Sequence, residues 1–291
     1  PNTSTNARPS WKTYLIRRFW RIYPAYFAAL LLSAGISYLC LNLWGDKNWD
    51  VSKLFRVATL TQNYPPGNGQ FLTNPSLWTI PLEVEFYLLY PLAFLFFASK
   101  RNYILLIFTF GISGLSILLS YQGYQWLTFT ALFLWPSWLL GAWIAKLHRD
   151  QKLKLIKLGY LLSLAGLSLG VSLISRYQSW ETWSQYFAWT AFYSFFFIFS
   201  LSYTDLLNRI IGNRLMKSVS WIGKISFSLY LTHFPLFRLF GYLHREIFED
   251  KPANFLISLF YLLPAILIAW LFFRWVEDPI HQWSKKRISN K

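Results

Sequence analysis

The sequence predicts an all-α fold, a polytopic bundle of transmembrane helices, on three observations. Hydrophobic residues make up 55% of the 291-residue chain, and the mean hydropathy is +0.31. Charged residues make up 14%, whereas soluble domains contain about 25%. The apolar residues fall in stretches of about twenty, the length that a helix needs to cross a bilayer core. These features argue against a soluble globular protein.

Eight hydrophobic segments are predicted to span the membrane, and loops such as NYPPGNGQ and EDKPAN separate them. We find no convincing internal repeat, so we treat residues 1–291 as a single transmembrane domain. The approximate limits of the predicted spans are 22–43, 78–99, 102–120, 124–147, 155–175, 185–203, 221–240 and 255–276.

The distribution of lysine and arginine predicts that both ends of the chain are cytoplasmic. With a cytoplasmic N-terminus, the inner segments hold three quarters of the 28 basic residues, while basic and acidic residues nearly balance in the outer loops. This topology, together with anionic inner-leaflet lipids, explains the net charge of +16. We therefore expect a plasma-membrane protein and no nucleic-acid partner.

The sequence gives little support for a disulfide or a metal site. Cys40 is the single cysteine, and the four histidines are scattered without metal-ligand spacing. We predict no internal disulfide and no metal centre.

Two glutamates interrupt the second predicted span, where a carboxylate in hydrocarbon is costly and tends to be functional or paired. Trp78 is an interfacial anchor at its start. Helical periodicity predicts that Glu85 points the opposite way from a face that carries Glu83, Tyr87, Tyr90 and Phe94. Glu83 is thus a candidate catalytic residue, and the alternative is a structural carboxylate that Tyr or Trp hydrogen-bonds.

The seventh predicted span carries Ser226, Tyr230 and His233 on one helical face. Pro235 cannot donate to the carbonyl of Leu231, so we expect a kink and a free acceptor beside His233. The histidine lies at a depth close to that of Glu83, and a Glu–His pair would suit proton transfer. The alternative is a buried histidine satisfied by Tyr or Ser.

Three arginines precede the first span in YLIRRFWRIYPAYF: Arg17, Arg18 and Arg21. Arginines beside a span usually serve as flanking charges that set the membrane topology. The alternative is that they bind phosphate, because guanidinium groups bind phosphate oxygens bidentately. Pro24 is expected in the opening turn of the next helix or at a kink. Glu277 and Asp278 lie on the same side and could pair with the arginines.

Four motifs together resemble the membrane-bound acyltransferase 3 family: RRFWRIYP, SLWTIPLEVEFYLLYPL, WIGKISFSLYLTHFPL and RWVEDPI. They occur in the family's order and cover nearly the whole chain. These enzymes O-acetylate polysaccharides and related glycans of the cell envelope. The resemblance implies transfer of an acyl group from cytoplasmic acyl-CoA, with acetyl-CoA as the expected co-substrate, to a carbohydrate or glycolipid acceptor outside.

The resemblance also implies roles for individual residues. Arg17, Arg18 and Arg21 match the arginine motif thought to serve the CoA donor. Trp78 and Glu83 match the Ser-Leu-Trp and first-glutamate positions, and Tyr230 and His233 match the Tyr-Leu-x-His signature. Glu85 stands where the family often has glutamine, so its carboxylate is not implied.

One departure from the family concerns the N-terminus. The family begins with two helices, the first of which bears the histidine regarded as the catalytic base, whereas this chain opens at Pro1 without them. We therefore expect a truncated domain, eight of ten spans, that is inactive alone and is not followed by a soluble domain. We do not assign the role of that histidine to His233. The functions left open are a membrane O-acyltransferase, a transporter or flippase for a lipid-linked glycan, and a non-catalytic relative.

Overall fold

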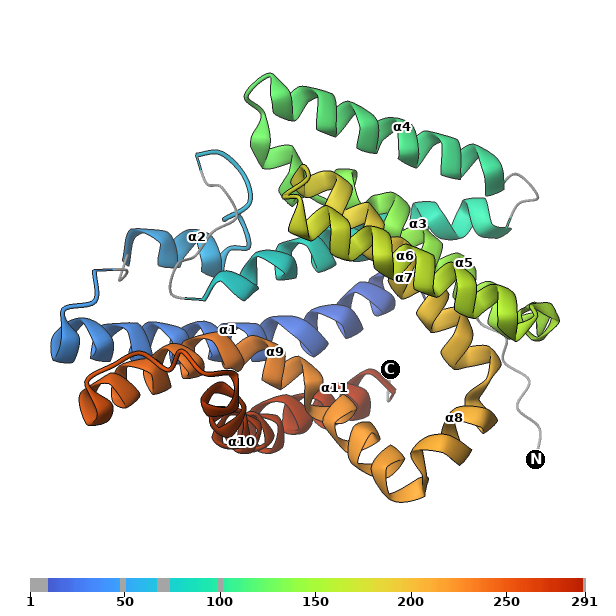
Figure 1. The fold of residues 1–291 in the computed structure, drawn as a ribbon. Helices are drawn as coiled ribbons and strands as arrows, with labels where there is room; N and C mark the ends of the chain where they lie inside the picture. The colour runs from blue at the N-terminus through green and yellow to red at the C-terminus, as the bar shows by residue number, and fades with distance from the viewer. Residues whose placement is uncertain (1–9, 48–50, 67–73, 99–101, 290–291) are drawn as a thin grey trace. The chain divides into compact units, whose positions relative to one another are not determined.

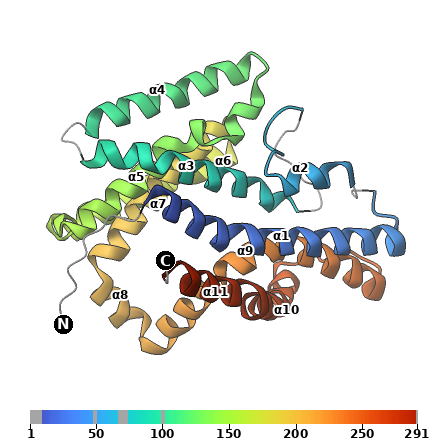
Figure 2. The same cartoon turned by 180° about the vertical axis from the view of Figure 1, so that it is seen from behind.

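The computed structural model describes residues 10–47, 51–66, 74–98 and 102–289, and throughout these ranges the regular structure is helical, without a strand (Figure 1, Figure 2). The prediction of an all-α fold is confirmed. The α-helices are α1 (Trp11–Trp44), α2 (Leu54–Ala58), α3 (Thr79–Ala98), α4 (Asn102–Tyr121), α5 (Ala131–Arg149), α6 (Leu158–Tyr177), α7 (Thr182–Ser202), α8 (Thr204–Ile211), α9 (Asn213–Phe248), α10 (Phe255–Phe272) and α11 (Asp278–Ser289).

Short helical turns connect several of these helices. A π-helical turn, η5 (Phe273–Glu277), joins α10 to α11. The other turns are 3-10 helices: η1 (Val51–Lys53), η2 (Pro75–Trp78), η3 (Gln125–Phe129) and η4 (Lys152–Leu155). The turn η2 leads directly into α3, the helix that carries Glu83 and Glu85.

The chain divides into two compact units. Unit 1 comprises Pro1–Pro91 and Ile222–Lys291, and unit 2 comprises Leu92–Trp221. Unit 2 consists of two helical hairpins, because α4 packs along α5 and α6 packs along α7. All the predicted catalytic and donor-binding residues lie in unit 1.

The core of unit 1 lies between α1 and α9. One buried cluster joins Ile22, Tyr26 and Leu30 of α1 to Leu231 of α9, with Leu77 of η2 beside them. A second cluster joins Ile36 and Cys40 of α1 to Leu236 of α9 and Ala265 of α10. In a bilayer, van der Waals packing and interhelical hydrogen bonds hold such helices together, because the lipid tails are as apolar as the buried side chains. α11 packs against α1 as well.

α1 is longer than the predicted span 22–43. It begins at Trp11, where the Ser10 side chain caps the first turn by accepting a hydrogen bond from the backbone N–H of Thr13. Pro24 lies inside this helix and not at its start. The arginines 17, 18 and 21 are therefore part of the same continuous helix as the apolar segment, which fixes their direction relative to it.

α9 contains Pro235 and continues beyond it. As expected, the carbonyl of Leu231 loses its helical donor, and the structure supplies another: the Asn74 side-chain amide donates to this carbonyl at 2.8 Å. Asn74 is fully buried and also donates to Ser33 of α1 at 3.0 Å. The proline therefore creates an acceptor that ties α9 to the residue preceding η2.

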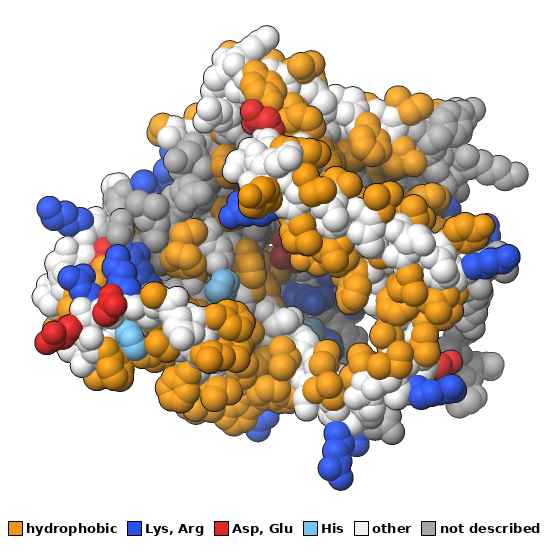
Figure 3. Space-filling view, viewed as in Figure 1, with side chains coloured by type: hydrophobic (Ala, Val, Ile, Leu, Met, Phe, Trp, Pro, Cys, Tyr) orange, Lys and Arg blue, Asp and Glu red, His pale blue; other side chains and the backbone are white. Residues whose placement is uncertain are grey.

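Within the described residues, five helices are long and apolar enough to cross a membrane, or six if the bent pair α7–α8 counts as one span. They coincide with six of the eight predicted spans. The predicted spans 78–99 and 221–240 correspond to α3 and α9, and that these two helices cross the membrane stays a prediction. Hydrophobic side chains cover much of the visible surface (Figure 3), as lipid-facing helices require.

Candidate active site

A cluster of polar side chains joins η2 and the start of α3 to α9. The Tyr230 hydroxyl donates to the Ser76 carbonyl at 2.6 Å and lies 2.6 Å from the Thr79 hydroxyl. Nε2 of His233 lies 3.4 Å from the Ser76 hydroxyl. Because a phenol has one proton, the Tyr230 proton is used on Ser76, and Tyr230 holds η2 in position beside His233.

The hydrogen-bond partners of His233 indicate which of its two ring nitrogens carries the proton. Its Nδ1 lies 2.8 Å from the Tyr230 carbonyl and 3.1 Å from the Leu229 carbonyl. A carbonyl only accepts, so Nδ1 carries the proton and Nε2 of the neutral ring presents its lone pair toward Ser76. This is the tautomer that a general base needs, because Nε2 can accept a proton from a hydroxyl.

A polar stripe runs along α3 from this cluster. Thr79, Glu83 and Tyr87 follow one another at intervals of four residues, on one helical face. The Tyr87 hydroxyl donates to Glu83 at 2.6 Å, as the predicted face requires. The stripe covers about 12 Å of the helix, at 1.5 Å per residue.

Glu85 has a separate partner, as expected from its opposite direction. The Tyr64 hydroxyl donates to it at 2.8 Å. Burial raises the pKa of Tyr64, and its hydrogen bond to Glu85 raises the pKa further, so Tyr64 stays a neutral donor. Glu85 and Tyr64 thus connect α3 to the preceding loop, and the two glutamates of α3 are not a pair.

The three arginines line one cavity of about 530 Å³. It lies between α1 and α11, and its other lining residues are Tyr14, His281, Ser284 and Lys285. Arg18 packs over the rings of Tyr14 and Tyr87, with its guanidinium carbon 5.3 and 4.7 Å from the ring centres. Tyr14 in turn stacks on Tyr90 of α3. The stripe on α3 therefore ends at the arginine cavity.

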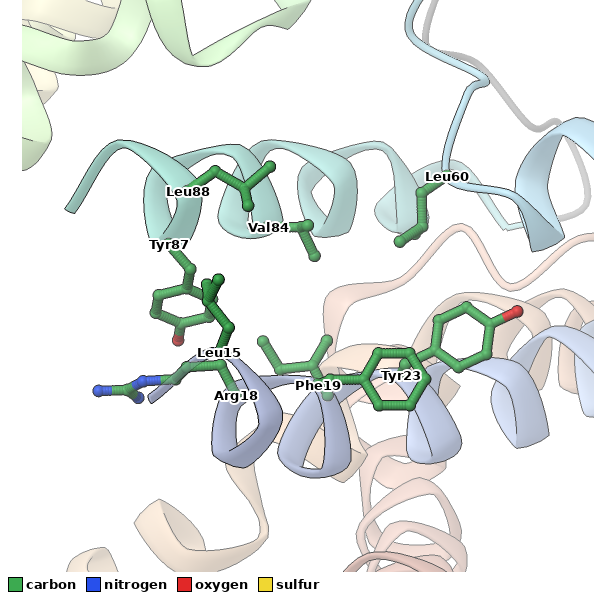
Figure 4. A pocket seen from close by; sticks show the side chains of 9 residues that line it. Leu15, Arg18, Phe19, Tyr23, Leu60, Val84, Tyr87 and Leu88 are labelled. Atoms are coloured by element: carbon green, nitrogen blue, oxygen red, sulfur yellow. The ribbon is translucent and has the colours of Figure 1, made fainter. Parts of the chain in front are cut away.

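A second cavity of about 270 Å³ adjoins the first and is almost wholly apolar (Figure 4). Arg18 and Tyr87 stand at one end of it, and side chains of α1 and α3 face each other across it. Its remaining lining residues are Leu15, Phe19, Ile22, Tyr23, Leu60, Val84 and Leu88. Arg18 lines both cavities, so a ligand bound there would meet charge on one side and apolar surface on the other.

The hydrogen bonds show the partners of the residues that the sequence suggested together. Glu83 binds Tyr87, while His233 binds Ser76 and backbone carbonyls, so the hydrogen bonds of the suggested Glu–His pair go to different partners. Glu277 accepts a hydrogen bond from Ser228 at 2.5 Å, and Arg21 is near enough to act on its charge. Trp78 is half-buried in the 3-10 turn η2, one residue before α3 starts.

Sequence reasoning missed several residues of these sites. Tyr14, His281, Ser284 and Lys285 complete the arginine cavity, and Thr79 and Asn74 complete the cluster at η2. A signal existed for Tyr14, which is four residues before Arg18 on the same helix. The contribution of α11 depends on tertiary packing against α1. Among the described residues, no three His, Cys, Asp or Glu side chains are grouped to hold a metal ion.

The chain is similar in sequence to a known family and to a curated protein. The family model described as an acyltransferase domain matches residues 2–274. A curated relative, the peptidoglycan O-acetyltransferase OatA of Listeria monocytogenes serovar 1/2a (strain ATCC BAA-679 / EGD-e), is 23% identical over 303 residues. The alignment covers 93% of this chain and 46% of the relative, so the chain spans about half of that protein's length.

No solved structure matches the chain. The family match extends over both units and includes three of the four sequence motifs in full; it ends at Arg274, the first residue of RWVEDPI. The chain therefore belongs to the acyltransferase family that was expected from its motifs.

Proposed function

We propose that this chain is the membrane-embedded part of an O-acyltransferase that moves an acyl group, foremost acetyl, from cytoplasmic acyl-CoA to a hydroxyl of an exported or cell-surface carbohydrate. The observation that carries the proposal is the polar stripe on α3. It connects a cavity suited to phosphate with a histidine suited to activate a hydroxyl. The similarity to a peptidoglycan O-acetyltransferase supports a glycan as acceptor.

The donor would bind at the arginine cavity. Arg17, Arg21 and Lys285 supply positive charge for the phosphates of CoA, and arginine binds phosphate oxygens in a fixed fork. The thioester arm would extend along the apolar cavity past Arg18. Both ends of the proposed donor are thereby held by residues of unit 1.

The acceptor hydroxyl would be activated near His233. A base takes the hydroxyl proton while the oxygen attacks the thioester carbonyl, and the CoA thiolate leaves. The resemblance gives the role of principal base to a histidine of the family's first helix, and we propose Nε2 of His233 as a second group that can accept the proton. Whether the acyl group passes directly or through an acyl-enzyme, the tetrahedral intermediate carries a negative oxygen. The indole N–H of Trp78 is the proposed donor to that oxygen. Tyr230 positions Ser76 and His233 through its bond to the Ser76 carbonyl.

The neighbouring glutamates of α3 provide the test, since they share one helix but have different partners. In the full natural protein, Glu83→Gln should lower acyl transfer at least about 100-fold, because it removes the only charge of the stripe. Glu85→Gln should leave transfer within about threefold, because the glutamine oxygen still accepts from Tyr64.

Membranes would be incubated with labelled acetyl-CoA and glycan, and thermal unfolding would report the fold of each variant. Wild-type transfer by the Glu83→Gln protein would remove Glu83 from the site. Movement of glycan across the membrane without label would instead support the transporter, and no activity of either kind would support a non-catalytic relative.

A further inference from the structure

A third cavity lies at the opposite end of α1 from the arginines. It measures about 330 Å³, and its lining residues are Trp44 of α1 with Tyr242, Arg245, Glu246 and Glu249 of the α9 end. Figure 3 shows acidic and basic side chains mixed at the left of the view, where Figure 1 places the ends of α1 and α9. None of the residues assigned to donor binding or acyl transfer contributes to this cavity.

Two of the lining side chains are aromatic and form a stacked pair, called here the aromatic platform. The rings of Trp44 and Tyr242 stack with their centres 5.1 Å apart and their planes 10° apart. Both rings pack on the buried cluster of Ile36, Cys40 and Leu236. A buried ion pair, Arg238 with Asp46, lies beneath, and Asp46 also interacts with the Tyr242 side chain. The platform is therefore preorganised, which reduces the entropy that a ligand must lose on binding.

Both acidic and basic side chains surround the platform. The Trp44 indole N–H donates to Glu246 at 2.9 Å, which fixes this carboxylate at the edge of the ring. Glu249 follows α9 in the left-handed backbone region, with φ 60°, and its N–H caps the Arg245 carbonyl. The lining bears one positive and two negative groups, so it does not favour a phosphate or another strong anion.

These features fit a neutral sugar. A flat aromatic face packs against the C–H groups of a sugar ring, and carboxylate and guanidinium groups hydrogen-bond to neighbouring hydroxyls. A quaternary ammonium ligand fits less well, because it prefers a box of aromatic rings without a guanidinium. Tyr242 is nine residues from His233 on α9, about 14 Å along the helix axis. A short oligosaccharide can bridge that separation.

We propose that the Trp44–Tyr242 cavity binds a neutral oligosaccharide segment, as a subsite for a sugar several units away from the hydroxyl that is acylated. The inference rests on the proposed function, in which the acceptor is a glycan. It adds a site that holds the glycan chain while the reacting unit lies at His233.

The test uses the N-acetylated forms of chitotetraose, a neutral tetrasaccharide, and of chitobiose, the corresponding disaccharide, with the full natural protein in lipid nanodiscs. Binding of fluorescently labelled sugar is measured separately from acetyl transfer. Trp44→Leu removes the aromatic face and should weaken chitotetraose binding about tenfold, while Trp44→Phe should keep most of it. Glu246→Gln should weaken binding without changing the platform.

Trp275→Leu is the matched control, because Trp275 is 72% exposed and lies in η5, away from this cavity. It should bind chitotetraose within twofold of the wild type. In the transfer assay, Trp44→Leu should raise the KM for chitotetraose about tenfold and leave chitobiose and acetyl-CoA unchanged, because only the longer acceptor reaches the cavity.

The outcomes separate the two proposals. Equal chitotetraose binding by the wild type, Trp44→Leu and Glu246→Gln proteins would overturn the subsite, whatever the transfer activity. Loss of binding in Trp44→Leu and Glu246→Gln, with the control unchanged, would support it even if no acetyl group is transferred. If Trp44→Leu fails to fold, Glu246→Gln decides, because its side chain lies at an exposed edge.

Discussion

Single residues of the site divide into those that carry charge and those that hold position. Tyr230 donates to the Ser76 carbonyl, and Asn74 donates to the Leu231 carbonyl and to the Ser33 hydroxyl, so these two residues orient η2 and α9. Arg17 and Arg21 face a cavity and are exposed. If these arginines bind the phosphates of CoA, replacing one of them should weaken binding of the acyl donor.

Arg17→Ala should raise the KM for acetyl-CoA between about tenfold and a hundredfold, because a hydrogen bond to a charged group contributes roughly 1.5–3 kcal/mol. The KM for acetyl-pantetheine, which lacks the phosphates, should not change. Arg149→Ala is the control, since Arg149 is exposed in unit 2 and pairs with Asp150. Equal effects of Arg17→Ala on both donors would contradict a phosphate role.

The sequence predicted several residue pairs from periodicity and missed those that depend on packing. Tyr87 with Glu83 follows from the four-residue spacing, and the separate direction of Glu85 follows from the same rule. The partner of Glu85, Tyr64, comes from a loop whose path no periodicity encodes. The partner of His233, Ser76, likewise depends on how η2 folds back onto α9.

At the scale of helices, Pro235 explains why Asn74 is placed where it is. Asn74→Ala should cost about 1–3 kcal/mol of unfolding free energy, because it leaves the buried Leu231 carbonyl without a donor. Pro235→Ala restores the helical N–H and should recover part of that loss in the double variant. Additive effects in a double-mutant cycle, measured by unfolding in mixed micelles, would contradict this coupling.

A buried ion pair joins Asp46, two residues after α1, to Arg238 of α9. Asp46→Asn should destabilise the protein by about 3–5 kcal/mol, because it leaves the Arg238 guanidinium buried without its counterion. Asp150→Asn is the matched control: its pair with Arg149 is exposed, and the expected loss is at most about 1 kcal/mol. Similar losses in the two variants would show that the Arg238 pair is not effectively buried.

For the molecule as a whole, composition and the length of apolar segments were enough to predict an all-helical membrane protein. The helix boundaries were harder to predict. α1 begins at Trp11 and continues through Pro24, because a proline is tolerated within a long packed helix. A hydropathy window excludes the helical turns that carry the arginines, so the predicted span began too late. The sequence motifs identified the family. The structure added the polar stripe on α3, which lies between the arginine motif on α1 and the His233 motif on α9.

We propose that one protein accepts acyl groups on the arginine side of the membrane and delivers them to a glycan on the other side. It is tested most directly in sealed vesicles that contain the full natural protein in one orientation. Labelled acetyl-CoA is supplied only on the side that bears Arg17, and glycan only on the opposite side. We expect label in the glycan with the wild type and none with Glu83→Gln. If acetyl transfer occurs only when both substrates are on the same side, transfer across the membrane would be contradicted.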